Sequence, residues 1–346
     1  MRSFSFKVKT GDWRAAFRVG LSVAVPLVFV YCAEALHFAV YAAFGALTSL
    51  YGHSENARQR IETQAVAGVA LLLTLTVAAA FSVAQGPQWV LFLLLAAVVV
   101  GAGTLGTLMG WVPRGEIFFI LVLLVVAGIP LESGAFLPAV GVGAGAAGFA
   151  VLLTVLEGEG AIGARSLVRS VRERARAGLS RLDRLRHAVV ILTAALAVVG
   201  AWGLALSFGM GHPFWAPIAA SALMPALTPA DAMRRATHML SGTLGGVAIA
   251  ALLFAQKPGT LALILMIALC QAVAELFLAR NYAIALLFIT PLAIGMSNLG
   301  RNLAWSPLLI DRLAEAALGA AVALGAIALG GWLLALLAGQ RVEREA

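Results

Sequence analysis

Long apolar runs separated by short polar breaks dominate the chain. Each run approaches the roughly 20 residues that a helix needs to cross the hydrocarbon core of a membrane. The pattern predicts two groups of six membrane helices, joined by a charged segment. The first six are expected near 15–33, 37–51, 61–84, 88–110, 116–130 and 135–156. The second six are expected near 187–207, 213–228, 235–255, 259–279, 281–297 and 308–337.

The composition agrees with this pattern. Of 346 residues, 62% are hydrophobic and only 12% are charged, and the mean hydropathy is +0.97. Soluble domains average roughly 45–50% apolar and 25% charged residues. We therefore expect an all-α polytopic membrane protein with about 12 transmembrane helices. The expected domains are a first six-helix membrane repeat over 1–156, an arginine-rich cytoplasmic linker over 157–186 and a second six-helix membrane repeat over 187–346.

The basic residues set the expected orientation, because lysine and arginine collect on the cytoplasmic side of multi-pass proteins. With the amino terminus inside, all 24 basic residues except Lys257, Arg301 and Arg312 fall on that side. We expect a multi-pass protein of a bacterial-type inner membrane, with both termini in the cytoplasm. The same rule accounts for most of the formal net charge of +8, so we expect no nucleic acid partner.

The two halves carry a sparse internal repeat. The stretch HFAVYAAFGALTSLYGHSENARQR aligns with PFWAPIAASALMPALTPADAMRRA, which pairs Arg58 with Arg234. A second alignment pairs Arg114 with Arg280. Because six spans are an even number, both copies enter the membrane from the same side. The expected repeats are therefore parallel and related by a pseudo-twofold axis along the membrane normal.

Four expected helices are too short for a full crossing. Residues 38–51 and 214–227 would each rise about 21 Å as helices, against roughly 30 Å of hydrocarbon. The spans near 116–130 and 281–297 are also short. Four prolines break these segments or adjoin them: Pro217, Pro225, Pro229 and Pro291. Since short or broken helices at matching positions of two repeats indicate a transport site, we expect these four to line a central pathway. Ordinary kinked packing helices are the alternative.

A pathway for an organic anion needs positive charge for a carboxylate and apolar or aromatic walls for a ring. Arg58, Arg234 and Arg235 lie where the short helices meet the cytoplasm, and they predict an electropositive entrance. Anchoring by lipid headgroups is the alternative for these arginines. We expect Glu55 and Asp231 to pair with them. A candidate rim on the outer side consists of His212, Phe214 and Trp215, with an interfacial aromatic belt as the alternative. Further candidate pathway residues are Tyr41, Thr48, Ser221, Tyr282 and Thr290.

Titratable groups inside or beside the spans are candidates for proton coupling or for structural pairing. Histidine titrates near physiological pH, and the candidates for proton coupling are His37, His53, His212 and His238. For Glu275 the expected partner is Arg280. For Asp311 it is Arg312, near the start of the last helix, where the two side chains either pair or cap that helix.

Motifs for catalysis and for cofactor binding are weak or missing. The stretch GAGTLG at 101–106 fits a dinucleotide pattern, but it lies inside an apolar helix with no preceding strand. The small-residue runs at 141–148 and 319–331 are expected to let helices pack closely. Cys32 and Cys270 are too few for a disulfide framework or a zinc site. We therefore expect no enzyme activity, no catalytic residue, no cofactor and no metal.

The second half carries a recognisable motif. The run HPFWAP, followed by MPALTP, an arginine-rich helix start and SGTLGG, resembles the core motif of the fusaric acid resistance (FUSC) or aromatic acid exporter family. NYAIALLFITPLA at 281–293 resembles that family's next signature. The resemblance to this family is best over 187–330. Plant aluminium-activated malate channels, in which two six-helix protomers surround one pore, are distantly similar. It implies an inner-membrane exporter of aromatic and related carboxylic acids.

Together these features predict efflux of organic anions, such as aromatic carboxylic acids, through a central pathway between the two repeats, with proton coupling as an option. The expected partners are a small organic anion, membrane lipid and, in an envelope assembly, a periplasmic adaptor subunit. An anion channel of the malate-channel type and a non-transporting subunit of an efflux assembly are the alternatives. A membrane-embedded enzyme would need a tight cluster of Asp, His or Cys, which the sequence does not show. Substrate identity, coupling ion and oligomeric state stay open.

Overall fold

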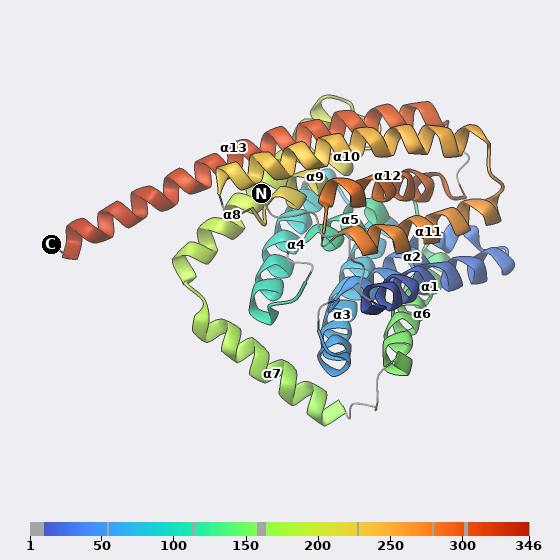
Figure 1. The fold of residues 1–346 in the computed structure, drawn as a ribbon, viewed down its shortest axis with the longest axis horizontal. Helices are drawn as coiled ribbons and strands as arrows, with labels where there is room; N and C mark the ends of the chain where they lie inside the picture. The colour runs from blue at the N-terminus through green and yellow to red at the C-terminus, as the bar shows by residue number, and fades with distance from the viewer. Residues whose placement is uncertain are drawn as a thin grey trace.

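The computed structural model describes residues 10–53, 55–112, 115–157, 164–226, 228–278, 280–300 and 304–345 (Figure 1). In these ranges the regular elements are helices. The first group is α1 (Thr10–Cys32), η1 (Leu36–Phe38), α2 (Ala39–Ala46), η2 (Leu47–Leu50), α3 (Ala57–Val83), α4 (Gln88–Met109), α5 (Ile117–Ala127), η3 (Ser133–Ala135) and α6 (Phe136–Glu157). The rest are α7 (Ala164–Arg181), α8 (Arg184–Ser207), α9 (Trp215–Leu223), α10 (Pro229–Ala255), α11 (Thr260–Leu278), α12 (Tyr282–Asn298) and α13 (Trp305–Glu345).

Eight helices of the described chain are long and apolar enough to cross a membrane: α1, α3, α4, α6, α8, α10, α11 and α13. The all-helical, polytopic class is therefore confirmed. Three shorter apolar stretches are Leu36–Leu50, Ile117–Ala127 and Tyr282–Asn298, and α9 has only 9 residues. These are the four segments that the sequence marked as short. Whether they bring the number of crossings to twelve stays a prediction.

Prolines lie at the start of α9 and just beyond its end. Pro217 lies in the first turn of α9, where a missing backbone N–H removes no intrahelical hydrogen bond. Pro225 lies in the turn that follows α9. Pro229 opens α10 directly after its N-cap Thr228. Pro291 differs from these three because it lies inside α12, where it takes one donor out of the helix ladder.

The short helices occupy the interior of the molecule. From Ala39 to Leu50 every residue of α2 and η2 is buried, and α9 is buried except at Ile218. Most of α5 is also buried, and α12 is buried along one face. The long helices expose many apolar side chains around them. The short helices therefore do not lie on the lipid-facing periphery.

The same helix pairs pack in the two halves. α2 packs against α6 as α9 packs against α13, and α3 packs against α6 as α10 packs against α13. α3 also contacts α5, and α10 contacts α12. Between the halves, α1 packs against α11 and α8 packs against α4. Each of these pairings has a counterpart in the other half. In Figure 1, α10 and α13 run side by side, while α3, α4 and α6 point across them.

Small residues bring paired helices into backbone contact, as expected for the glycine-rich runs. A Cβ added at Gly45 of α2 would lie 2.1 Å from the carbonyl oxygen of Gly143 on α6. A Cβ added at Gly319 of α13 would lie 2.2 Å from the carbonyl oxygen of Ala216 on α9. Both distances are far shorter than van der Waals contact, so glycine is required at these two crossings.

The arginine-rich linker forms a helix that docks on the first half. α7 contacts α3 and α4. Arg174 of α7 donates hydrogen bonds, each 2.9 Å long, to Glu55 Oε1, Thr63 Oγ1 and the carbonyl oxygen of Met109. The linker is therefore a packed element, with further arginines exposed on its other faces: Arg169, Arg172, Arg176 and Arg181.

Candidate functional site: two arginines over aromatic rings

Charged side chains lie inside the apolar second half. Arg312 and Glu315 stand one turn apart on α13, and they are 7% and 0% exposed. Glu315 accepts the backbone N–H of His212 at 3.0 Å on one oxygen and that of Trp215 at 3.2 Å on the other. The N-cap residue of α9, Phe214, makes no side-chain cap of its own. Glu315 thus caps α9 from another helix, at the end where the helix dipole favours an anion.

Arg312 has a different environment. Its guanidinium carbon lies 5.5 Å from the centroid of the Trp215 ring, close enough for a cation–π interaction. Its Nε has no hydrogen-bond partner, and no described carboxylate forms an ion pair with it. Glu315 and Tyr282 act on it only through longer-range electrostatics. A buried cation is costly without a partner. The unpaired Nε of Arg312 is therefore a donor available to an anion.

A second arginine lies over a second ring. The guanidinium carbon of Arg235 is 5.0 Å from the centroid of Tyr282, and its Nε donates to the carbonyl oxygen of Ala222 at 2.8 Å. Tyr282 also interacts electrostatically with Arg312. Arg235, Tyr282, Arg312 and Trp215 therefore follow one another through α10, α12, α13 and α9. We call these four residues the arginine–aromatic series.

His212 lies beside this series. Its Nδ1 is 2.8 Å from Asp311 Oδ2, and its ring stacks on Trp215 with 5.1 Å between centroids. The expected pairing of Asp311 with Arg312 is therefore wrong. Adjacent residues of a helix do not face each other, so Asp311 reaches His212 while Arg312 points to Trp215. Arg312 is also inside the bundle rather than at a helix cap.

One contact joins the two halves close to α9. Ser221 donates a hydrogen bond to Glu116 Oε1 at 3.2 Å. Glu116 is the N-cap residue of α5, outside the eight long apolar helices, and is 4% exposed. Burial raises the pKa of the Glu116 carboxyl to about 7, although its hydrogen bonds to the backbone and to Ser221 act in the opposite direction. This carboxyl therefore titrates near neutral pH.

Comparison with known proteins bears on the half that holds these residues. Residues 185–326 match the family described as fusaric acid resistance protein-like. The resemblance noted in the sequence is thereby confirmed, and the matched region contains the complete arginine–aromatic series. The distant similarity to plant malate channels stays a prediction.

A curated relative matches a stretch of similar length. The chain is 30% identical over 141 residues to the uncharacterized membrane protein YvaC of Bacillus subtilis (strain 168). The aligned stretch is 40% of this chain and 21% of YvaC, so it spans about a fifth of that relative's length. No solved structure matches the chain.

The entrance arginines divide into two environments. Arg58 is largely exposed, 3.6 Å from Glu62. Arg234 is also largely exposed, 2.8 Å from Asp231, so this expected pairing is confirmed. Arg235, its neighbour in the fusaric acid resistance-like region, turns inward to Tyr282 instead. The expected pairing of Glu55 with an entrance arginine is wrong, because its carboxylate binds Arg174 of α7.

The four candidate histidines also differ. His212 and His53 each lie beside a carboxylate, whereas His37 and His238 are exposed. His53 Nδ1 is 2.8 Å from Glu275 Oε1. Glu275 therefore does not pair with Arg280 as expected. Arg280 instead pairs with Asp12 of α1. The other member of the second alignment, Arg114, lies outside the described residues.

The candidate hydroxyl groups lie in the interior. Tyr41, Thr48, Ser221 and Thr290 are all buried. Among them Ser221 has an acidic partner, Glu116. The hydroxyl oxygens of Thr48 and Thr290 have no hydrogen-bond partner in the described structure. Phe214 is partly buried and lies edge-on to Trp215, with 5.3 Å between ring centroids.

Two groups of this site were missed from the sequence. Glu315 was not singled out, and Arg312 was expected to pair with Asp311 or to cap the last helix. A signal was present, because an Arg-x-x-Glu pair places both charges on one face of a helix that is otherwise apolar.

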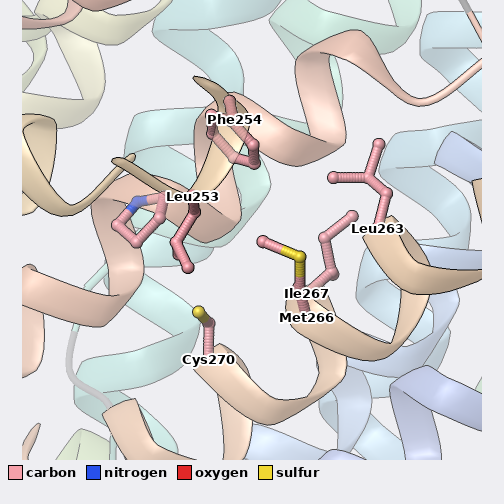
Figure 2. Close-up of a pocket in the computed structure, with 7 residues that line it drawn as sticks. Leu253, Phe254, Leu263, Met266, Ile267 and Cys270 are labelled. Atoms are coloured by element: carbon pink, nitrogen blue, oxygen red, sulfur yellow. The ribbon is translucent and has the colours of Figure 1, made fainter. Parts of the chain in front are cut away.

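An apolar pocket lies apart from the arginine–aromatic series, between α10, α11 and α12 (Figure 2). Its lining consists of Leu253, Phe254, Leu263, Met266, Ile267, Cys270 and Pro291. Since none of these side chains carries a charge, the pocket offers nothing to hold a carboxylate.

Proposed function

We propose that this protein transports organic anions, aromatic carboxylic acids among them, out of the cell across a bacterial-type inner membrane. The arginine–aromatic series carries the proposal. Arg312 is buried in an apolar helix bundle and Arg235 is partly buried, each lies over an aromatic ring, and neither forms an ion pair with a described residue. Ionisable groups within a membrane protein are functional candidates, and the guanidinium fork matches a carboxylate.

The route runs between two parallel six-helix repeats, 1–156 and 187–346, joined by the linker 157–186. Two observations support this layout: the helix pairs that recur in both halves and the interior position of the four short helices. Helices too short to cross alone leave backbone groups that are tolerated only against protein or a wet cavity. In this proposal both termini and α7 are cytoplasmic.

The exposed arginines Arg58 and Arg234 form the cytoplasmic entrance and raise the local concentration of anions. Their acidic neighbours Glu62 and Asp231 hold them in place. If transport is coupled to protons, His212 is the favoured group, because it contacts Asp311 and stacks on Trp215 of the series.

The test is flux of labelled benzoate into proteoliposomes, with and without a pH gradient. Flux well above that of protein-free vesicles is expected. The double variant Arg58→Ala with Arg234→Ala should lower it about two- to tenfold at low salt, with less effect at high salt. Arg172→Ala, which removes an exposed arginine of α7, is the matched control and should leave flux unchanged. Absence of flux under every gradient would contradict the proposal and favour a non-transporting subunit.

A further inference from the structure

Arg312 is a buried cation whose acidic neighbours are already engaged. Both oxygens of Glu315 accept backbone N–H groups at the start of α9, and Asp311 binds His212. A guanidinium group has five N–H donors and no acceptor. Its Nε has no hydrogen-bond partner in the described structure, and its guanidinium carbon lies 5.5 Å from the centroid of the Trp215 ring. The chain therefore places a buried positive charge against an aromatic ring and leaves its Nε donor unpaired.

The first half shows that the helix contact itself does not need these charges. Gly143 of α6 and Gly319 of α13 occupy equivalent crossings against α2 and α9. Seven residues before each glycine stand Phe136 and Arg312, and four residues before each stand Ala139 and Glu315. The fold thus builds the same kind of crossing once with apolar residues and once with a buried arginine and a buried acid. Packing alone does not explain the charged version.

We propose that Arg312 binds the single carboxylate group of the transported anion, that Trp215 forms a wall for its apolar part, and that Glu315 excludes dianions. This inference rests on the proposed function. Bidentate hydrogen bonding lets one guanidinium hold one carboxylate. A second carboxylate on the same molecule would approach Glu315, one turn away. Glu315 accepts an N–H on each oxygen, so it offers no free donor to a second carboxylate, and in its ionised form it repels one at low dielectric.

The difference between the two halves at these positions also sets the number of carboxylate sites in each chain. Phe136 and Ala139 offer no group that can hold an anion, so each chain is expected to bind one carboxylate at this level, in the second half only. The entrance arginines would then concentrate anions of any valence, while the choice between monoanions and dianions is made at Arg312.

Binding is tested on purified protein in detergent by the thermal unfolding midpoint, with benzoate and succinate at equal concentration. A ligand that binds only the folded state raises the midpoint. Wild type should be stabilised by benzoate and much less by succinate. Arg312→Met should abolish the benzoate effect, and Arg172→Met, an exposed arginine without a role in the site, should retain it. A wild type that benzoate does not stabilise, or an Arg312→Met variant that it stabilises fully, overturns the site.

Flux separates this inference from the proposed function. In proteoliposomes Arg312→Met should reduce benzoate flux at least about tenfold, which corresponds to 1.4 kcal/mol or more. If the Arg312→Met variant transports benzoate at the wild-type rate, the proposed carboxylate site is wrong, while the proposed transport function is not contradicted. Benzoate binding without flux in wild type would overturn transport and leave the site standing. If Arg312→Met does not fold, Arg312→Lys decides, because an ammonium group lacks the fork and should still lose several-fold in benzoate flux.

Selectivity is tested by Glu315→Gln, which can still accept one N–H at the start of α9. The ratio of succinate flux to benzoate flux should rise at least about threefold, because the repelling charge is gone. An unchanged ratio would overturn the role of Glu315 in excluding dianions.

Discussion

Arg18 and Arg312 are both buried arginines, one in each half of the molecule, and their surroundings differ. Arg18 of α1 is 3% exposed and pairs with Glu157 at the end of α6. Arg60 reaches the same carboxylate at 3.4 Å. Arg312 is 7% exposed and faces a tryptophan ring without a described acidic partner. Arg18 thus has the environment of a structural ion pair, whereas no described carboxylate forms an ion pair with Arg312.

The polar groups around the short helices follow the same division. In the first half Gln64 binds the carbonyl oxygens of Ser49 and Tyr51 at 3.4 and 3.3 Å, and accepts the hydroxyl of Thr154 at 2.7 Å. This network is neutral and satisfied within the chain, so it stabilises the end of α2 without attracting an ion. In the second half the interior contains the buried charges of Arg312 and Glu315.

The largest expected effect concerns these two arginines. Arg18→Met breaks a buried ion pair and should lower the free energy of unfolding by about 3 kcal/mol. Arg312→Met removes a buried charge that forms no ion pair with a described residue. This variant should change the free energy of unfolding by less than about 1 kcal/mol. Denaturant unfolding in a mild detergent measures both. Equal losses in the two variants would remove the distinction between a structural and a binding arginine.

A second prediction concerns Glu116, at the contact between the halves. In the folded protein burial raises the pKa of this carboxyl to about 7, whereas that of an unperturbed glutamate is 4.5. Its contribution to stability is therefore complete below about pH 4.5 and is lost as the pH rises through 7. Between pH 5 and pH 7 the loss amounts to about 2 kcal/mol.

The side chain introduced by Glu116→Gln cannot ionise. The free energy of unfolding of this variant, measured relative to wild type, should therefore rise by about 2 kcal/mol from pH 5 to pH 7. Ser221→Ala is the matched control, because it removes the hydrogen bond to Glu116 and leaves the carboxyl buried. A constant difference between Glu116→Gln and wild type from pH 5 to pH 7 would show that Glu116 is already ionised.

The positions of the helices were largely predictable because they depend on local sequence. The expected span 88–110 corresponds to α4, Gln88–Met109. α10 begins at Pro229 rather than near 235. The apolar pattern marks only the part of a helix that lies in lipid, and polar turns such as the one with Arg234 extend beyond it.

The side-chain partners were less predictable because they depend on tertiary packing. Glu275 was assigned to Arg280 by closeness in sequence, yet its partner is His53 from the first half. In the same way Asp311 binds His212, 99 residues away, and not Arg312. Sequence indicated some of the polar groups inside the bundle, Glu275 among them, but it missed Glu315 and did not show which groups the fold brings together.

The smallest expected effect concerns the linker helix, which covers the first half only. Arg174→Ala removes three hydrogen bonds that hold α7 to α3, α4 and the loop before α3. Backbone amides of α7 should then exchange with solvent about tenfold faster, which corresponds to about 1.4 kcal/mol of local stability. Arg172→Ala on the exposed face should leave exchange unchanged. If both variants behave like wild type, the docking of α7 does not depend on Arg174.

The central claim is that organic anions pass through the interior beside α9, and thiol labelling tests it most directly. In a chain without Cys32 and Cys270, a cysteine at Ser221 of α9 is compared with one at Leu265, an exposed apolar position on α11. During benzoate transport, the account predicts that a water-soluble, membrane-impermeant thiol reagent labels the Ser221→Cys variant, that added benzoate slows this labelling, and that the Leu265→Cys variant stays unlabelled. A transporting Ser221→Cys variant that is never labelled, or that benzoate does not protect, would contradict the account.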